Sequence, residues 1–474
     1  MIRIWLVCFA WMTYACIHTG LFAVNGSASE PSSNYPQFRG AAGNASSIRR
    51  LPTVWSDDDS GRINIRWKIP VDGEGWSQPI VWDDVIYLTA AVPQGDATDA
   101  TVEPYRGGGG RSRLDLMDTI YRYTVTAIDA NTGQQIWQTV CKTGTPPVPR
   151  HNTNTYATET PVTDGRQIYA YFGMNGVYAL DRDGSVVWFK DLGVYPMRAD
   201  WGTASSPVVH DDKLFIQMDN QENSFLVALD TSTGDEIWRV GRDEKSQYST
   251  PFVWRNSVRD ELIVGGMVYR SHDPETGGLL WQLDMNKGRS SATPVAEGDR
   301  LYVGNEFRNR GGADDGGGRL FCVLPGGEGD ITPPEDASQT EWVDWWIERA
   351  DLQMASPTVC QGRLYLLERR TGNLHCVDTN DGSTVYRQRI RGAKAFWASP
   401  WTDGVHVYAL DSDGTTHVIS GGESYQLVAA NDLAEQTWGT PAIAGGRIYL
   451  RTLHFLYCIE ALQPTFTEQS TNNP

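Results

Sequence analysis

Eight short segments of this chain end in a proline, and the residues just before that proline are well suited to hold a ligand. Three positions before the proline stand Trp76, Tyr248, Trp397 and Trp438 in four of the segments. Aromatic rings gathered around one opening can stack on a flat ligand. The same rings can also pack between neighbouring structural elements, so the spacing leaves a binding and a packing interpretation open.

One carboxylate interrupts this pattern. Two positions before the proline the residue is small in every segment except one, where Glu159 stands. A buried carboxylate must be paired, bound to a metal or neutral. The candidate partners of Glu159 are Arg198, Lys394 and a cation such as Ca²⁺, which prefers oxygen ligands. Glu159 is therefore the candidate metal ligand.

Directly before the proline, seven segments carry a hydroxyl residue and the eighth carries Gln78. Where strands crowd together, small residues fit and hydroxyls can bond to the neighbouring strand. These hydroxyl residues are Thr160, Ser206, Thr250, Thr293, Ser356, Ser399 and Thr440.

Other polar residues give weaker signals. His151 precedes the second segment and could face the same opening as Glu159, or simply be solvated. Aspartates recur in turns such as DANTG and DTSTG, but none continues as a full calcium loop. Capping of their own turns explains them better. They are Asp129, Asp181, Asp230, Asp273 and Asp378.

The eight prolines reveal the architecture that must position these residues, because they recur at intervals of about 43 residues with two longer gaps. Each unit continues with a hairpin, a third strand such as FLVALD, a turn rich in Asp, Thr and Gly, and a fourth strand that usually reaches an aromatic residue. Four antiparallel strands per unit are typical of a propeller blade. The prolines are Pro79, Pro161, Pro207, Pro251, Pro294, Pro357, Pro400 and Pro441.

The last unit stops before its fourth strand. The stretch INIRWKIP (63–70) reads as such a strand and stands alone before the first unit. An N-terminal strand that completes the last blade closes the ring without a free edge. The sequence therefore predicts an all-β fold, an eight-bladed β-propeller of four-stranded antiparallel blades that is closed by an N-terminal strand.

Small and aromatic residues in the third and fourth strands are expected to be scaffold. Cys322, Cys376 and Cys458 take the position held elsewhere by alanine, and buried cysteine behaves as a small hydrophobe. The tryptophans of the fourth strands should pack one blade on the next. They are Trp67, Trp137, Trp188, Trp238 and Trp281.

The N-terminus predicts export, because Arg3 precedes a mostly apolar run and Gly26 to Ala28 offer small residues for cleavage. Acylation of Cys16 is the second interpretation. We expect a periplasmic or extracellular protein without a transmembrane segment. The predicted organisation is a signal peptide (1–28), an N-terminal extension (29–61), the propeller (62–462) and a polar tail (463–474).

The net charge of −18 and the pI near 4.9 argue against nucleic acid and against anionic membranes as partners. Long insertions after Pro93 and around residues 309–342 lengthen two units, and their glycine content favours flexible loops. No vicinal cysteines and no CxxCH stretch occur in the sequence, so a covalently attached haem is not expected.

The repeated pattern in AIDANTGQQIW, ALDTSTGDEIW and HDPETGGLLW resembles the tryptophan-docking repeat of PQQ-like (pyrroloquinoline-quinone repeat) β-propeller proteins. Secreted bacterial members of this family look most similar, and quinoprotein dehydrogenases and the propeller lipoprotein of outer-membrane barrel assembly are related. The resemblance covers about residues 35 to 460 and implies the fold more strongly than an activity. In the dehydrogenases a vicinal disulfide and a catalytic aspartate surround the quinone, and neither matches a motif here.

Two functions follow as hypotheses. The first is a non-catalytic binding or scaffold propeller that holds a protein or a small molecule at the channel mouth or on the inserted loops. The second, implied by the resemblance, is a quinoprotein oxidoreductase that binds PQQ and Ca²⁺ over the channel. Glu159 would then bind the metal, and Trp76, Tyr248, Trp397 and Trp438 would surround the quinone.

Overall fold

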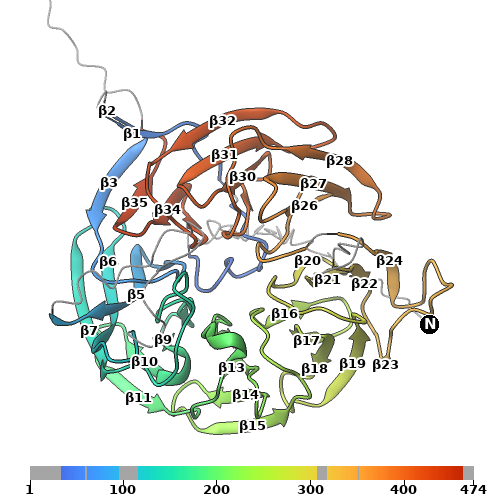
Figure 1. Cartoon of the computed structure of the whole chain (residues 1–474), viewed down its shortest axis with the longest axis horizontal. Coiled ribbons are helices and arrows are strands. Elements are labelled where there is room, and N and C mark those ends of the chain that lie inside the picture. Colours follow the sequence, from blue (N-terminus) through green and yellow to red (C-terminus); the bar gives the residue numbers. More distant parts are fainter. Residues whose placement is uncertain are drawn as a thin grey trace, which may run out of the picture. The chain divides into compact units, whose positions relative to one another are not determined.

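The computed structural model describes residues 34–47, 49–58, 61–95, 116–306, 318–350 and 352–462. Eight sheets form a ring, each built from strands that follow one another outward from the centre (Figure 1). Each of the eight blades has four antiparallel strands, so the predicted eight-bladed propeller is confirmed. The predicted signal peptide and the polar tail lie outside the described residues.

Each blade keeps the strand order that the repeat predicted. Blades 1 and 2 contain β4 (Ile80–Trp82), β5 (Val85–Pro93), β6 (Tyr121–Asp129) and β7 (Gln135–Gly144), then β8 (Val162–Thr163), β9 (Gln167–Tyr171), β10 (Val177–Asp181) and β11 (Val186–Lys190). Blades 3 and 4 contain β12 (Val208–His210), β13 (Lys213–Met218), β14 (Phe225–Asp230) and β15 (Glu236–Gly241), then β16 (Phe252–Arg255), β17 (Asp260–Val264), β18 (Val268–His272) and β19 (Leu279–Asp284).

The second half of the ring repeats the same order. Blades 5 and 6 contain β20 (Val295–Glu297), β21 (Arg300–Gly304), β22 (Leu320–Val323) and β24 (Val343–Ile347), then β25 (Thr358–Cys360), β26 (Arg363–Leu367), β27 (Asn373–Asp378) and β28 (Thr384–Arg389). Blades 7 and 8 contain β29 (Trp401–Thr402), β30 (His406–Leu410), β31 (Thr415–Ser420) and β32 (Leu427–Asp432), then β33 (Ala442–Ala444), β34 (Arg447–Arg451), β35 (Phe455–Ile459) and β3 (Ile65–Pro70).

Part of the insertion in blade 5 is ordered as a strand. In this insertion, β23 (Gly329–Asp330) pairs in parallel with β19, so blade 4 has five strands. This segment therefore differs from the flexible loop that its glycine content favoured. A separate hairpin of β1 (Ser56–Asp58) and β2 (Gly61–Ile63) precedes β3.

The ring is closed by β3, as the isolated stretch INIRWKIP (63–70) predicted. It pairs antiparallel with β35, and Trp67 lies opposite Cys458. A second contact crosses the same seam, because the buried guanidinium of Arg451 in blade 8 donates to the carbonyl oxygen of Thr89 in blade 1 at 2.6 Å. First and last blades are thus joined by the chain itself and by a buried hydrogen bond.

In several blades, a tryptophan of the fourth strand docks onto the next blade. The indole of Trp188 donates to the Thr231 carbonyl of the following blade at 2.9 Å, and its ring packs on Gly234 in the turn after β14. Trp67, Trp137 and Trp238 make the same contacts with the blades that follow them. Trp281 differs, because its indole donates within its own blade to the buried carboxylate of Glu261 at 2.6 Å.

The remaining scaffold predictions also hold. Cys322, Cys376 and Cys458 are buried with free thiols, opposite the aromatic residue of the second strand, where Ala228 lies opposite Phe215 in blade 3. The turn aspartates accept hydrogen bonds from backbone N–H groups two or more residues further on, as Asp230 does from Ser232 and Thr233. Capping, and not metal binding, accounts for them.

A chain of hydrogen bonds links the inner ends of the blades. From Gln78 to Ser399, the N–H group of the residue before each proline donates to the hydroxyl of the next blade, as Ser206 does to Thr250 at 3.1 Å. Seven such bonds run from Gln78 to Thr440, with lengths of 2.9 to 3.1 Å. The side chain of Gln78 itself turns to the N-terminal segment and accepts from the N–H of Arg39 at 3.1 Å.

That N-terminal segment (34–47) crosses the centre of the ring, as the blue coil in Figure 1 shows. Tyr35 bridges to Val81 of blade 1, and the Pro36 carbonyl accepts from Thr163 of blade 2. Further along, Asn44 bonds to Val359 of blade 6 and Ser46 bridges to Thr402 of blade 7. All of these partners follow the inner prolines by two residues, so the segment closes the channel at the end opposite the aromatic positions.

Candidate functional site

The structure has a cavity of about 1290 Å³ at the mouth of the central channel. Residues from all eight blades line it, including the hydroxyl residues of the inner ring from Thr160 to Thr440. Phe38 of the N-terminal segment also lines the cavity, so this segment supplies part of the floor. The four aromatic candidates Trp76, Tyr248, Trp397 and Trp438 are all lining residues, which brings the predicted aromatic positions together in one place.

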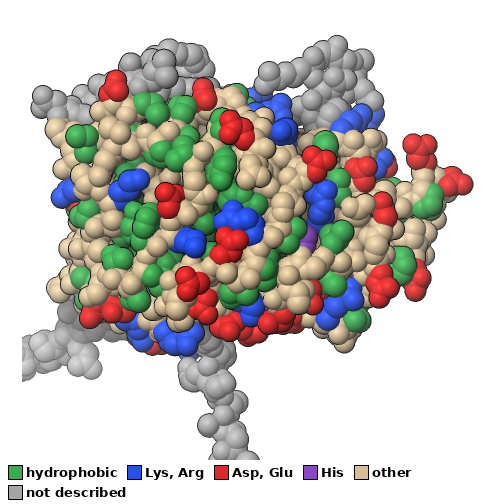
Figure 2. All heavy atoms as spheres, turned by 90° about the horizontal axis from the view of Figure 1, so that it is seen from below, with side chains coloured by type: hydrophobic (Ala, Val, Ile, Leu, Met, Phe, Trp, Pro, Cys, Tyr) green, Lys and Arg blue, Asp and Glu red, His purple; other side chains and the backbone are tan. Residues whose placement is uncertain are grey.

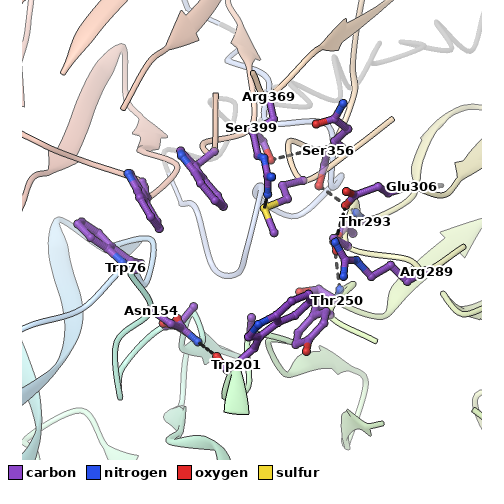
Figure 3. A pocket seen from close by; sticks show the side chains of 18 of the residues that line it. Trp76, Asn154, Trp201, Thr250, Arg289, Thr293, Glu306, Ser356, Arg369 and Ser399 are labelled. Atoms are coloured by element: carbon purple, nitrogen blue, oxygen red, sulfur yellow. Dashed lines mark hydrogen bonds and ion pairs between the residues drawn. The ribbon is translucent and has the colours of Figure 1, made fainter. Parts of the chain in front are cut away.

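On one side of the cavity, three tryptophans stand in a row. The rings of Trp397 and Trp438 are stacked, with centroids 4.1 Å apart and planes 9° apart. Trp76 continues the row at 5.5 Å from Trp438, and the guanidinium of Arg369 lies 4.6 Å from the centroid of Trp397. Figure 3 shows the labelled ends of this row, Trp76 and Arg369. Trp397 and Trp438 therefore already have stacking partners within the protein.

Trp201 forms the second aromatic centre, together with Tyr248. Their ring centroids lie 6.2 Å apart, and the guanidinium of Arg289 lies 4.7 Å from the centroid of Trp201. Arg198 approaches the same indole at 5.9 Å. Burial raises the pKa of Tyr248 to about 12, and the two nearby arginines oppose this shift. Tyr248 therefore stays protonated and remains a hydrogen-bond donor at neutral pH.

Among the described residues that line the cavity, the charged side chains are mostly arginines, although the chain as a whole is acidic. They are Arg198, Arg289, Arg369 and Arg370, with the carboxylate of Glu306. Glu306 is buried and ion-paired with Arg289 at 3.2 Å, which Figure 3 shows as a dashed line. On the outer face of the ring, acidic side chains are scattered among basic and hydrophobic ones (Figure 2). Among the described residues, the mouth therefore carries more guanidinium groups than carboxylates.

Glu159 is buried but does not line the cavity. Thr158 and Thr160 on either side of it are lining residues, and alternate residues of an extended chain point in opposite directions. Its carboxylate lies near Thr203 and Gly173, and its Oε1 atom has no hydrogen-bond partner. Burial raises the pKa of Glu159 to about 7, while hydrogen bonding from Thr203 and nearby backbone groups opposes the shift. Of the three possibilities for a buried carboxylate, a largely neutral side chain fits this environment best at slightly acid pH.

Residues that could bind a metal do not gather in the part of the chain that the structure describes. Across those ranges, no group of three or more His, Cys, Asp or Glu side chains comes together. His151 lines the cavity, and its Nδ1 lies 2.6 Å from the hydroxyl of Thr153. Arg198, a candidate partner of Glu159 from the sequence, instead lines the cavity beside Trp201.

Sequence reasoning missed several residues of the cavity. Four lining residues lie outside the aligned positions of the repeat. Phe38 belongs to the N-terminal segment, Trp201 and Arg289 precede inner strands, and Arg369 lies between the second and third strands of blade 6. Trp201 was the easiest of them to infer from the sequence, since it begins the segment WGTASSP, which contains Ser206. The position of Phe38 could not be inferred, because nothing in the repeat predicts that the N-terminal segment crosses the channel.

The fold and the repeat define a class, the PQQ-like β-propellers. The chain belongs to the PQQ_2 family, described as "Outer membrane protein assembly factor BamB", whose family model matches residues 122–269 and 338–453, more than half of the chain. Among curated proteins, none matches the chain in sequence.

Solved structures share the fold at low sequence identity. BamB from Moraxella catarrhalis is 13% identical with a TM-score of 0.55, over 84% of this chain and 97% of that chain. Quinohemoprotein alcohol dehydrogenase from Comamonas testosteroni is 13% identical with a TM-score of 0.58, over 91% of this chain and 81% of that chain. A quinohemoprotein alcohol dehydrogenase from Pseudomonas putida HK5 is 12% identical with a TM-score of 0.56. These similarities show the propeller fold. Any activity has to be argued from the residues of the cavity.

The described residues contain no helix long and apolar enough to cross a membrane.

Proposed function

We propose that this protein is an exported, non-catalytic binding propeller that holds its ligand in the cavity at the channel mouth. The observation that carries the proposal is the cavity of about 1290 Å³, which residues of every blade line. Its lining consists mainly of groups that bind, namely indole rings, hydroxyls and guanidinium groups. Among the described lining residues, the one carboxylate, on Glu306, is ion-paired with Arg289.

The size of the cavity bears on what could enter it. Pockets for drug-sized ligands occupy roughly 300–1000 Å³, so this one accommodates a large small molecule or the end of a longer chain. A protein partner that inserts a terminus or a loop is one form of the same proposal. It is in keeping with the word "assembly" in the family description.

A cavity-filling substitution tests the proposal. Ala204 lines the cavity and is half-buried, whereas Ala430 is exposed on the outer strand β32. In the mature protein, beginning near Ser29, we expect Ala204→Trp to abolish binding of any ligand found by thermal-shift screening. Ala430→Trp is the matched control and should bind as the wild type does. Equal binding by the two variants would place the ligand elsewhere and overturn the proposal.

A quinoprotein oxidoreductase that binds PQQ and Ca²⁺ is the second candidate, and one observation favours it. PQQ is a planar quinone with carboxylate groups, and the cavity combines indole rings with four arginines. The metal part fits less well, because Glu159 is absent from the lining and the described residues bring together no group of three metal-binding side chains.

Titration with PQQ, with and without Ca²⁺, separates the two candidates. Calorimetry and tryptophan fluorescence would follow binding to the mature protein. Stoichiometric, calcium-dependent binding would favour the oxidoreductase and justify a screen of alcohols and sugars as substrates. Absence of binding at high micromolar quinone would favour the non-catalytic propeller.

A further inference from the structure

Arg39 lies inside the channel, in the N-terminal segment (34–47) that crosses the centre of the ring (Figure 1). Its backbone N–H donates to the side chain of Gln78 in blade 1 at 3.1 Å. Its Nη2 donates to the carbonyl oxygen of Pro357 in blade 6. Both partners belong to the inner ends of blades that are not neighbours in the ring. The side chain of Arg39 therefore reaches across the interior of the channel.

The guanidinium of Arg39 is a buried charge that the protein itself compensates poorly. The residue is only 1% exposed, and its Nε and Nη1 atoms have no hydrogen-bond partner among the described residues. Burial lowers the pKa of Arg39 from its ordinary 12.5 to about 10, so the group is still protonated at neutral pH. A buried charge is costly unless an opposite charge and hydrogen bonds compensate it.

Other buried arginines of this chain have that compensation. Arg242 is ion-paired with Asp219 at 2.8 Å. Arg150 is ion-paired with Glu74 at 2.5 Å. Within the described ranges, Arg39 forms no ion pair with a carboxylate. The negative charge that accompanies the other two arginines is therefore missing inside the channel.

A second donor beside Arg39 is also unsatisfied. The hydroxyl of Tyr35 is buried and has no hydrogen-bond partner in the described part of the chain. Tyr35 lies close enough to Arg39 for each group to act on the pKa of the other. Burial raises the pKa of the Tyr35 phenol, so the hydroxyl keeps its proton. The Nε and Nη1 atoms of Arg39 and the Oη atom of Tyr35 are thus three donors that have no acceptor among the described residues.

These donors indicate the chemistry of a ligand. We propose that Arg39 and Tyr35 form a binding site for a small monovalent anion, such as chloride, inside the channel. One negative charge neutralises one guanidinium, whereas a dianion would leave a net charge buried. N–H and O–H groups supply the hydrogen bonds that such an anion accepts. A water molecule could accept the same hydrogen bonds, but it would leave the positive charge uncompensated.

The anion has a route to this site from the cavity at the channel mouth. Phe38, the residue before Arg39, lines that cavity. The three donor atoms themselves are inaccessible to solvent, so entry of the anion requires a small shift of these side chains and favours a small ion. Once bound, the anion would help to hold the N-terminal segment across the channel. The anion site is distinct from the ligand site proposed in the cavity, so either proposal can fail without the other.

Bromide diffraction locates the anion. Crystals of the mature protein, grown in sodium bromide, should show an anomalous peak in hydrogen-bond contact with the guanidinium of Arg39. Bromide peaks on the surface, with none in the channel, would overturn the proposal. The wild type is used here, so the result does not depend on the folding of a variant.

Thermal unfolding in matched salts measures what the anion does for stability. A ligand that binds only the folded protein raises its melting temperature as the ligand concentration rises. The wild type should therefore melt at a higher temperature in sodium chloride than in sodium gluconate of equal ionic strength, since screening is the same and gluconate is too large for the site. Equal melting temperatures would contradict the proposal. A bromide peak without this difference would mean an adventitious ion only, and the proposal would fall.

Two pairs of variants assign the effect to the donors. Arg39→Met removes the buried charge and should melt at the same temperature in both salts. Arg391→Met changes the net charge equally at an exposed position and should keep the difference seen for the wild type. Tyr35→Phe removes one donor and should reduce the difference. Tyr425→Phe removes another hydroxyl that has no partner among the described residues, and it should not. A full chloride effect in Arg39→Met would place the anion elsewhere and refute the proposal.

Discussion

The indole rings of Trp397 and Trp438 are nearly parallel, at 4.1 Å between centroids and 9° between planes. They come from neighbouring blades and occupy the same position of the repeat. Their contact therefore joins blades 7 and 8 at the mouth, just as the hydroxyl ring joins them nearer the axis. The stack also holds the ring of Trp397 in place, and the guanidinium of Arg369 lies over this ring.

Replacement of Trp397 by alanine should weaken both packing and binding. Loss of the half-buried ring removes the stack with Trp438 and the support of Arg369, and we expect the free energy of unfolding to fall by about 2–3 kcal/mol. Urea unfolding followed by far-UV circular dichroism measures this. Trp397→Phe keeps part of the stack and should lose less. Identical unfolding midpoints for the alanine variant and the wild type would refute the prediction.

The glycine beneath a docking tryptophan should not tolerate a side chain. Gly234 has φ +74°, and a Cβ atom there would lie 2.6 Å from Cε3 of Trp188. Gly234→Ala should therefore destabilise the protein by about 2–4 kcal/mol, through backbone strain and steric overlap. Gly241→Ala is the control, because no atom lies within 4 Å of the position of its Cβ. Urea unfolding of both variants checks this, and similar midpoints would contradict it.

One link of the hydroxyl ring can be removed without a change of shape. Thr250→Val leaves the N–H group of Ser206 without its acceptor, and an unpaired buried donor costs about 1–3 kcal/mol. Thr250→Ser keeps the hydroxyl and should lose less stability. Urea unfolding of the two variants measures the difference. A valine variant as stable as the serine variant would show that the ring contributes little.

Glu159 should make stability depend on pH. Its pKa is about 7 in the folded protein against an ordinary 4.5, so its contribution to stability is fully present below pH 4.5 and is lost as the pH rises through 7. The loss amounts to about 3 kcal/mol. Glu159→Gln stays neutral, so it should match the wild type near pH 4 and exceed its stability at pH 8. Urea unfolding at both pH values checks this, with the exposed Glu328→Gln as the control. A constant difference between Glu159→Gln and the wild type would contradict the shift.

The wild type and Glu159→Gln also test whether Glu159 binds a metal ion. A Ca²⁺ ion bound by Glu159 requires the ionised carboxylate. Calcium should then raise the melting temperature of the wild type at pH 8 and leave that of Glu159→Gln unchanged. Equal melting curves with and without calcium would end the hypothesis for this residue.

The sequence was sufficient for the fold because each blade repeats the same signals. The proline before the inner strand, the aromatic residue of the second strand and the turn aspartate recur at matching positions, so errors in one unit are corrected by the others. Closure by β3 could be inferred because one strand was missing and one was left over. The aromatic and hydroxyl residues of the cavity could be predicted for the same reason.

The charged part of the cavity could not be predicted, since it depends on residues that do not repeat. Arg289 precedes the inner strand of blade 5, and Arg369 follows the second strand of blade 6. Only the curvature of the ring brings these segments to one mouth. The orientation of Glu159 could have been anticipated, because alternate residues of an extended strand point to opposite sides and Glu159 lies between Thr158 and Thr160, which line the cavity.

The pairing of β3 with β35 has a consequence for how the molecule is made. Trp67 lies opposite Cys458, so the first strand of the ring finds its partner only when almost the whole chain is available. Contacts between residues so far apart in sequence form late and slowly. A chain that crosses a membrane from its N-terminus would hold β3 unpaired until blade 8 arrives. Delivery of the C-terminal blade is thus the event that completes the ring, and a chain shortened by that blade would expose both of its neighbours.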